Sequence, residues 1–215
     1  MTIRYLLIVM LLAASPAWSD VTPPQGPSGR MELWLLVNNW PSLEEIRPAG
    51  GGQFDPVGVG IGGAIYATAR EYENSVLLVG IDGFIAANES DAEGIFEVLT
   101  ARQLYIGAAV KWAFGEERSF SLDAGIGYHY ADIAEVGTAF SGYERQVWDA
   151  HRAGAYIGAT LDFPPISIGS PGRWMVGFKA QFTDFGTVYG PGPLGPSAGK
   201  LDGPVYSLQI GYGFR

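Results

Sequence analysis

The sequence is poor in the residues on which most site chemistry depends. It has no cysteine, only two histidines, and charged residues make up 16% of the chain. The absence of cysteine excludes a disulfide framework, thiol chemistry and lipoprotein processing. The spacing of histidines and carboxylates gives no metal-ligand pattern, so we expect no metal and no cofactor. The formal net charge is −9 and no basic stripe occurs, so we expect no nucleic-acid partner.

Long hydrophobic runs are confined to the beginning of the chain. Residues 1–19 combine the cation Arg4, the apolar stretch Tyr5–Ala14 and a small-residue cleavage site ending at Ser19, which predicts a secretory signal peptide. That apolar stretch has only about ten residues, whereas a membrane-spanning helix needs ~20. No later run approaches this length, so we expect no transmembrane helix. The Pro- and Gly-rich residues 20–30 are expected to form a flexible arm, and residues 31–215 a single domain.

What the sequence does contain is alternation, which is clearest in its last stretch, Pro204–Arg215. The bulky apolar residues share one parity: Tyr206, Leu208, Ile210, Tyr212 and Phe214. The other parity carries smaller or polar residues: Val205, Ser207, Gln209, Gly211 and Gly213. This period of two predicts a β-strand with one apolar face.

Similar alternation divides the chain into eight expected strands. They are Met31–Trp40, Val57–Ala69, Ser75–Ala87, Leu104–Phe114, Ser119–Ile133, Trp148–Phe163, Arg173–Phe185 and Val205–Phe214. Most reach the ~9–11 residues that a tilted transmembrane strand needs. The expected connections alternate between short (Arg70–Asn74, Gly115–Arg118, Pro164–Gly172) and longer (Pro41–Pro56, Asn88–Gln103, Ala134–Val147, Gly186–Pro204). This sorting is typical of an outer-membrane β-barrel with both termini in the periplasm.

The apolar face of these strands is expected to point outward. In Leu104–Phe114, for example, Ile106 and Val110 share one parity, whereas Gly107 and Lys111 share the other. An eight-stranded barrel is only just wide enough for side chains to fill, so bulky groups on every strand would overfill its lumen. Turned outward, they form a lipid-facing band. The sequence therefore predicts an all-β fold, an eight-stranded antiparallel up-and-down transmembrane β-barrel. Aromatic residues near the short turns fit an interfacial girdle: Trp112, Phe114, Phe120, Phe163, Trp174, Tyr212 and Phe214.

Through this architecture and its last strand, the chain resembles the small eight-stranded outer-membrane barrels of the OmpA/OmpX/OmpW type. In that family the last strand is the signal that the barrel-assembly machinery reads. The resemblance implies this role for the outward residues Tyr206, Leu208, Ile210, Tyr212 and Phe214. It also implies the assembly machinery and periplasmic chaperones as partners, with outer-membrane lipid and lipopolysaccharide of a Gram-negative bacterium as surroundings. The family's usual terminal residue is aromatic, whereas here Arg215 follows Phe214.

The inward parity carries polar side chains that we expect to fill the lumen. They are Glu32, Asp82, Lys111, Asp123, His129, Arg152, Asp162, Lys179 and Gln181. Buried charges are costly unless they are paired, so opposite charges should be neighbours. We expect Lys111 to lie between Asp82 and Asp123, and Lys179 to meet Asp162. The leading interpretation is a polar plug that rigidifies the barrel, and the alternative is a narrow, gated ion path.

The expected function is therefore non-enzymatic: membrane integrity or surface interaction, with long loops outside. One alternative is a narrow channel for small or apolar molecules. Another is a lipid A-modifying enzyme. Lipid A deacylase barrels carry the pattern His-x-Ser-Asn. This pattern is absent here, because Ala131 stands two residues after His129, where the pattern needs serine. Asp149, His151 and Ser141 could gather at the outer loops, but their spacing is not specific, so no catalytic residue is assigned.

Overall fold

The structure is a computed structural model, and it describes residues 29–46, 53–90, 97–115, 119–137, 144–163, 172–190, 194 and 198–214. The expected signal peptide (1–19), residues 20–28 of the expected arm and Arg215 lie outside these ranges. The elements are β1 (Gly29–Asn39), the 3-10 helix η1 (Pro41–Glu45), β2 (Val57–Tyr72), β3 (Ser75–Glu89), β4 (Glu97–Phe114), β5 (Phe120–Gly137), β6 (Glu144–Phe163), β7 (Gly172–Phe182), β8 (Gly186–Val188), β9 (Gly199–Leu201) and β10 (Pro204–Phe214). No helix among the described residues is long and apolar enough to cross a membrane.

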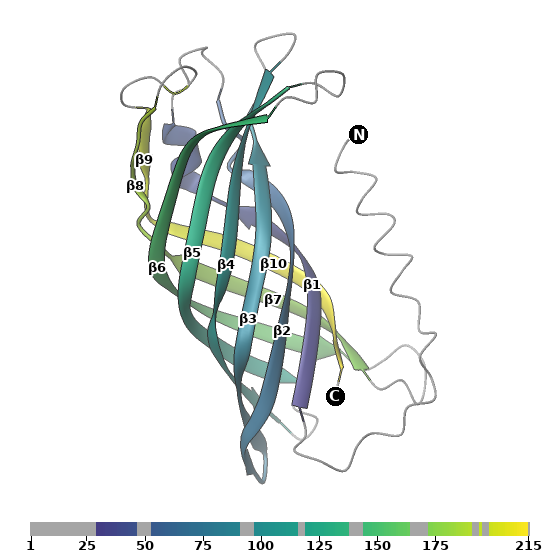
Figure 1. Ribbon diagram of the computed structural model, residues 1–215. Coiled ribbons are helices and arrows are strands. Elements are labelled where there is room, and N and C mark those ends of the chain that lie inside the picture. Colours follow the sequence, from purple (N-terminus) through teal and green to yellow (C-terminus); the bar gives the residue numbers. More distant parts are fainter. Residues whose placement is uncertain are drawn as a thin grey trace.

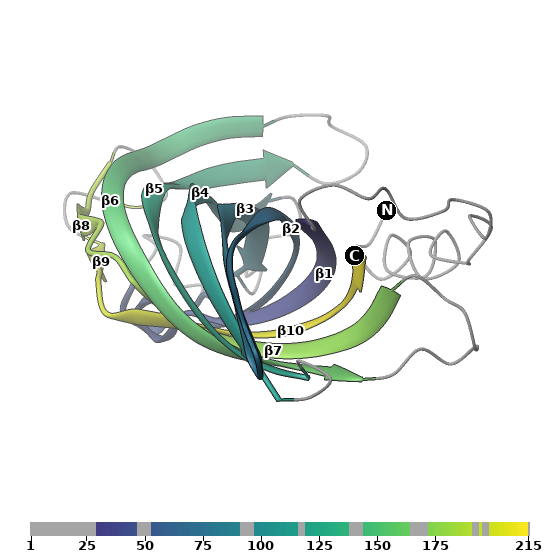
Figure 2. The same cartoon turned by 90° about the horizontal axis from the view of Figure 1, so that it is seen from below.

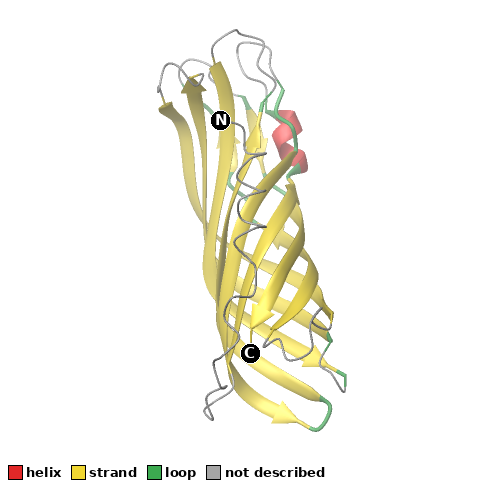
Figure 3. Cartoon of the chain, turned by 90° about the vertical axis from the view of Figure 1, so that its right-hand side faces the viewer, coloured by secondary structure: helices red, strands yellow, loops and turns green. Residues whose placement is uncertain are grey.

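Eight of the strands close into a barrel in the order β1-β10-β7-β6-β5-β4-β3-β2, and every neighbouring pair is antiparallel (Figures 1 and 2). The last strand pairs with the first, with Leu33 opposite Tyr212 and Val37 opposite Leu208. The predicted fold is confirmed. We call the end where β1 begins and β10 ends the turn end. The opposite end, which carries the β8–β9 hairpin (Figure 1) and the helix η1 (red in Figure 3), is the loop end.

Apolar side chains cover the outside of the wall. Ile126, Ile65 and Ile157 are 69%, 61% and 60% exposed, and other large apolar residues of the same parity are exposed around the ring. A water-soluble barrel has the opposite arrangement, with its bulky apolar groups inside. A continuous apolar exterior around a polar interior is the arrangement of a barrel that crosses a membrane.

The strands differ in length from the prediction at the loop end. β4, β5 and β6 have 18, 18 and 20 residues, whereas β1, β7 and β10 have 11 each. β4 begins at Glu97 instead of Leu104, and β6 begins at Glu144 instead of Trp148. The wall of β4, β5 and β6 therefore stands above the rest of the ring (Figure 1). The long connections also contain η1 and the β8–β9 hairpin, which the alternation did not predict.

Candidate functional site

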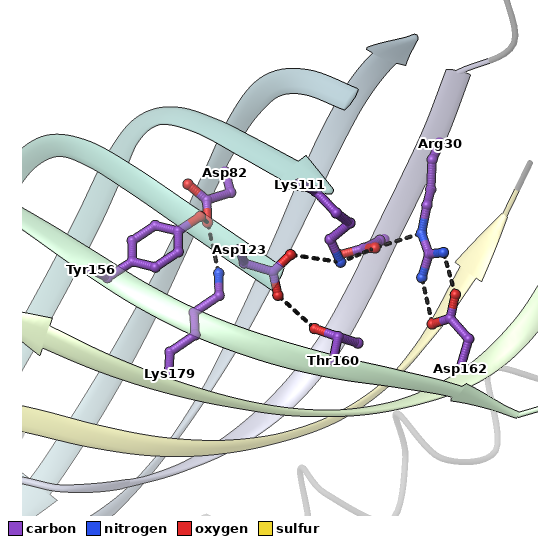
Figure 4. A network of polar contacts seen from close by, with 9 residues as sticks. Arg30, Asp82, Lys111, Asp123, Tyr156, Thr160, Asp162 and Lys179 are labelled. Atoms are coloured by element: carbon purple, nitrogen blue, oxygen red, sulfur yellow. Dashed lines mark hydrogen bonds and ion pairs between the residues drawn. The ribbon is translucent and has the colours of Figure 1, made fainter. Parts of the chain in front are cut away.

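The turn-end half of the lumen contains a network of charged side chains, which begins at Arg30 on β1 (Figure 4). Its guanidinium donates to both carboxylate oxygens of Asp162 on β6, with 2.7 Å between Nη2 and Oδ1. Its Nε lies 2.5 Å from Oε1 of Glu32. A guanidinium facing a carboxylate through two parallel donors is the strongest common ion-pair geometry. Arg30 therefore anchors the start of the first strand to the opposite wall.

Lys111 on β4 continues this network. Its ammonium lies 2.6 Å from Oε1 of Glu32 and 3.3 Å from Oδ1 of Asp123 on β5. The hydroxyl of Thr160 donates to the other oxygen of Asp123 at 2.7 Å. Lys111 and Asp123 are directly opposite each other in the β4–β5 ladder, as the sequence predicted for this pair. We call Arg30, Glu32, Lys111, Asp123, Thr160 and Asp162 the turn-end network.

A second polar group lies nearer the middle of the barrel. The ammonium of Lys179 on β7 and the hydroxyl of Tyr156 on β6 each lie 2.7 Å from Oδ2 of Asp82 on β3. The same ammonium lies 4.2 Å from the ring centroid of Tyr156 and 4.8 Å from that of Trp34. Such contacts between a cation and an aromatic face stabilise a charge that has left water. Lys179 is thus enclosed by one carboxylate and two rings.

The charges of the lumen nearly cancel. Among the charges that are no more than 6% exposed, three cations (Arg30, Lys111, Lys179) face four carboxylates (Glu32, Asp82, Asp123, Asp162), a net charge of −1. Removing such groups from water is tolerated only when each has an opposite charge and hydrogen bonds. The contacts also connect β1 directly with β4 and β6, neither of which neighbours it in the ring. The lumen is therefore braced across its width.

Two of the predicted pairings are wrong for the same reason. Lys179 contacts Asp82 instead of Asp162, and Asp82 does not contact Lys111. In the β6–β7 ladder Lys179 is opposite Gly158, so it lies four residues from the level of Asp162. Asp82 is opposite Gly107, again four residues from Lys111. Four residues span ~13 Å along a strand, too far for an ion pair. The alternation in the sequence predicted correctly that these side chains lie on the inner face. It could not predict the register, that is, which residues of neighbouring strands lie opposite each other.

Arg152 is a further correction, because it has inward parity but is exposed. β6 pairs with β7 only from Ala155 onward, so Arg152 lies above the end of β7. Its guanidinium donates to the backbone oxygen of His151 at 2.8 Å. The other expected lumen residues are buried: Gln181 accepts from Nε2 of Gln103 at 3.3 Å, and the ring of His129 packs 4.6 Å from that of Tyr105.

Sequence reasoning missed the aromatic filling of the lumen and the role of Arg30. Arg30 was assigned to the flexible arm, although it shares the parity of Glu32, and that signal was available. The rings of Trp34 and Tyr156 occupy space that glycines leave free. A Cβ on Gly125 would lie 2.3 Å from the ring of Tyr156, and one on Gly62 would lie 2.4 Å from Nε1 of Trp34. These glycines are needed for close approach of a neighbouring side chain.

Above the lumen, at the loop end, lies an apolar cluster that we call the cap. It joins the three longest strands, β4, β5 and β6, to the segments before β2 and before β10. Its buried members are Trp40, Leu43, Ile46, Phe54, Leu99, Ala101, Ala131, Ile133, Trp148, Ala150, Phe185, Val188, Leu194, Ala198, Leu201 and Val205. At the lumen side of the cap, two asparagines connect β1, β3 and the segment before β2. Asn38 Nδ2 donates to Asn88 Oδ1 at 3.0 Å, and Asn88 Nδ2 donates to the backbone oxygen of Pro56 at 2.8 Å. The cap meets the loop end of the lumen where the ring of Phe185 packs 6.5 Å from that of His129.

The candidate catalytic residues are only partly placed. His151 lies on the outer face of β6, with Nε2 3.3 Å from Oδ2 of Asp149 and with Nδ1 against the hydroxyl of Tyr128. Ser141 lies outside the described residues. Within the described part of the chain, no three His, Asp or Glu side chains are placed to hold a metal ion.

The expected assembly residues lie on the outer face of β10. Tyr206, Leu208 and Ile210 are exposed, and Tyr212 and Phe214 are partly exposed. At the turn end, Tyr212 packs against Phe214 and against Trp174, with ring centroids 4.9 and 5.5 Å apart. Trp112 and Phe120 are also exposed at this end, so aromatic rings gather where the sequence predicted a girdle.

No protein-family model and no curated protein matches the sequence. Among solved structures, Ail, the attachment invasion locus protein of Yersinia pestis, is 12% identical at a TM-score of 0.46, covering 86% of this chain and 96% of its own. The outer membrane protein OprG from Pseudomonas aeruginosa is 14% identical at 0.44, covering 88% and 97%. Neisserial surface protein A is 11% identical at 0.43, covering 88% and 99%. At such scores, it is the strand register itself that establishes the chain as an eight-stranded antiparallel β-barrel.

Proposed function

We propose that the protein is a non-enzymatic integral outer-membrane barrel whose filled lumen braces it, and whose loop end serves surface interaction or membrane integrity. One observation carries this proposal: all seven lumen charges are buried and paired. An ion path needs groups that bind a passing ion and release it. Here each of these charged groups is already paired with an opposite charge of the chain, and the cap lies above them.

The apolar exterior supports a position in lipid, because a contiguous exposed surface of this size is not stable in water. The resemblance to OmpA/OmpX/OmpW-type barrels supports the outer membrane, with both termini in the periplasm and the loop end outside. Lipopolysaccharide would then surround the loop end. The outer face of β10, with its terminal rings, would be read by the assembly machinery after delivery by periplasmic chaperones.

Conductance across a planar bilayer tests the plug. We expect no discrete current steps from the wild-type protein. Steps that disappear when Lys111 or Asp123 is replaced would contradict the proposal and favour the ion path. Lipid A mass spectra from cells with and without the protein test the absence of enzyme activity. The acyl count should be unchanged, and a change that is lost in His151→Ala would favour the enzyme.

A further inference from the structure

Between the cap and the contacts of Lys179 lies a group of buried polar side chains that we call the polar layer. It consists of Gln103 on β4, His129 on β5, Gln181 on β7 and Thr183, which follows the end of β7. None of the four is more than 7% exposed. None of them belongs to the turn-end network, and the functions considered so far leave them without a role.

Contacts bring the members of the polar layer together. Nε2 of Gln103 donates to Oε1 of Gln181 at 3.3 Å. Thr183 is two residues beyond Gln181 and therefore continues the same face of the chain. A Cβ on Gly154 of β6 would collide with both Oγ1 of Thr183 and Nε2 of His129, so these two atoms lie within about 5 Å of each other. The layer thus spans the lumen from β4 and β5 to β7.

The polar layer contains several polar atoms without a hydrogen-bond partner among the described residues. They are Oε1 of Gln103, both ring nitrogens of His129 and Oγ1 of Thr183. Just below, Oδ1 of Asp82 also has none within the described ranges, because the Lys179 ammonium binds the other oxygen of that carboxylate (Figure 4). Buried polar atoms without a partner cost free energy, so such groups are normally satisfied.

The chemistry of these atoms selects the kind of ligand. The oxygens of Gln103 and Asp82 can only accept a hydrogen bond, whereas a neutral imidazole offers one donor and one acceptor, and the Thr183 hydroxyl can do either. A cation would leave the imidazole N–H of His129 unpaired, and an anion would meet two acceptor oxygens. Water both donates and accepts, and one molecule with hydrogen bonds of ~2.8 Å spans the gap between Thr183 and His129.

The layer also has a route to the outside that avoids the cap. The last pair of the β6–β7 ladder is Ala155 and Phe182, and Thr183 follows directly where the two strands part. Arg152, which lies opposite His129 in the β5–β6 ladder, is exposed just above this point. Thr183 is also the most exposed member of the layer, at 7%. Its hydroxyl is therefore the first polar group on the way in.

We propose that the polar layer is a site for ordered water, with at least one molecule bound between His129 and Thr183, and that this water enters where β6 parts from β7. A buried water of this kind makes two to four hydrogen bonds to groups that the chain leaves unsatisfied. The plug would then exclude ions and still exchange water with the loop end. The site does not rest on the proposed surface role.

The first test looks for the water directly in the folded protein in nanodiscs. Hydroxyl radicals produced by a short X-ray pulse oxidise side chains beside bound water, and mass spectrometry identifies them. His129, at 0% exposed, should be oxidised, whereas Trp40, at 1% in the apolar cap, should not. After rapid mixing with heavy-oxygen water, the heavy label should appear at His129 more slowly than at the exposed His151, because bound water exchanges more slowly than bulk water.

The second test uses the sign of a change in stability. Thr183→Val replaces the hydroxyl with a methyl group of similar size, and losing a bond to water should raise the equilibrium constant for unfolding about two- to tenfold. If the hydroxyl had no partner, the same change would lower that constant. Thr160→Val, which removes a donor to Asp123, should raise it in either case. Thr187→Val, on the exposed face of β8, should leave it unchanged.

A dry layer would overturn the proposal. It would appear as no oxidation of His129 above that of Trp40, or as a lowered unfolding constant in Thr183→Val. Label that entered His129 as fast as His151 would also overturn it, since the lumen would then be open to solvent and hold no bound water. Neither measurement involves ion conductance, so this proposal and the proposed plug can fail separately.

Discussion

The barrel wall encloses two interiors of opposite character. Below the cap, from the turn end to the middle of the barrel, seven charged groups and several rings fill the space, and the outside of the wall is apolar. In the cap, the interior is apolar, and the outside of the same strands carries polar groups such as Arg102, Asp149 and His151. β4, β5 and β6 run through both regions without interruption.

This difference shows that the interior takes the polarity opposite to its surroundings. Where lipid surrounds the wall, apolar groups are stable outside, and the lumen holds the polar ones. Above the lipid, water surrounds the wall, and burying apolar groups again lowers the free energy. Along β4, the apolar residue lies outward at Leu104 but inward at Leu99. The inversion between them marks the expected boundary between lipid and water.

The largest expected effect comes from breaking the turn-end network. Lys111→Met removes the cation shared by Glu32 and Asp123 and should lower the free energy of unfolding by about 3–5 kcal/mol. Urea-induced unfolding in lipid vesicles, followed by the gel shift of unboiled samples, measures it. Arg70→Met removes an exposed cation and should cost less than about 1 kcal/mol. Equal effects would mean that water, not the chain, solvates the lumen charges.

The change in polarity of the outer face between the lipid-facing band and the loop end can be tested with substitutions on that face. Ile126→Lys places a charge in the lipid-facing band and should cost about 2–4 kcal/mol of barrel stability. Gln146→Lys places the same charge on exposed β6 above the inversion, where it should cost about 0–1 kcal/mol. Unfolding of both variants in the same vesicles gives the comparison. A similar cost at both positions would place the boundary elsewhere.

The junction between the two interiors should respond more weakly. Asn38→Leu leaves Oδ1 of Asn88 without its donor, which should cost about 1–3 kcal/mol. The backbone N–H of Trp40 donates to the oxygen of Pro56, so its hydrogen exchange should become faster. Asn39→Leu, on the exposed parity next to it, is the control and should leave that exchange unchanged.

The inversion also explains which features the sequence could predict. Within the lipid zone one face is consistently apolar, so alternation gave all eight strands and the faces of Lys111 and Asp123. The fourth predicted strand began only at Leu104, where the sense of alternation reverses, although the backbone pairing of β4 continues to Glu97. The cap depends on packing between segments far apart in the chain, which no local pattern encodes. The partners of Asp82 and Asp162 depend on register, which parity leaves open.

The smallest expected effect separates the cap from the barrel below it. Ile133→Val removes one methylene from a fully buried cap residue and should cost about 0.5–1.5 kcal/mol. Because the segments that carry β8 and β9 pack on β4, β5 and β6 through the cap, this cost should appear as local opening of those segments. The amides of Phe185 and Ala198, which donate to Leu201 and Val188, should exchange about two- to tenfold faster. Ile157→Val, the same change on the lipid face, should leave this exchange unchanged. If the cap variant instead lowered the unfolding midpoint of the whole barrel, the two interiors would form one cooperative unit.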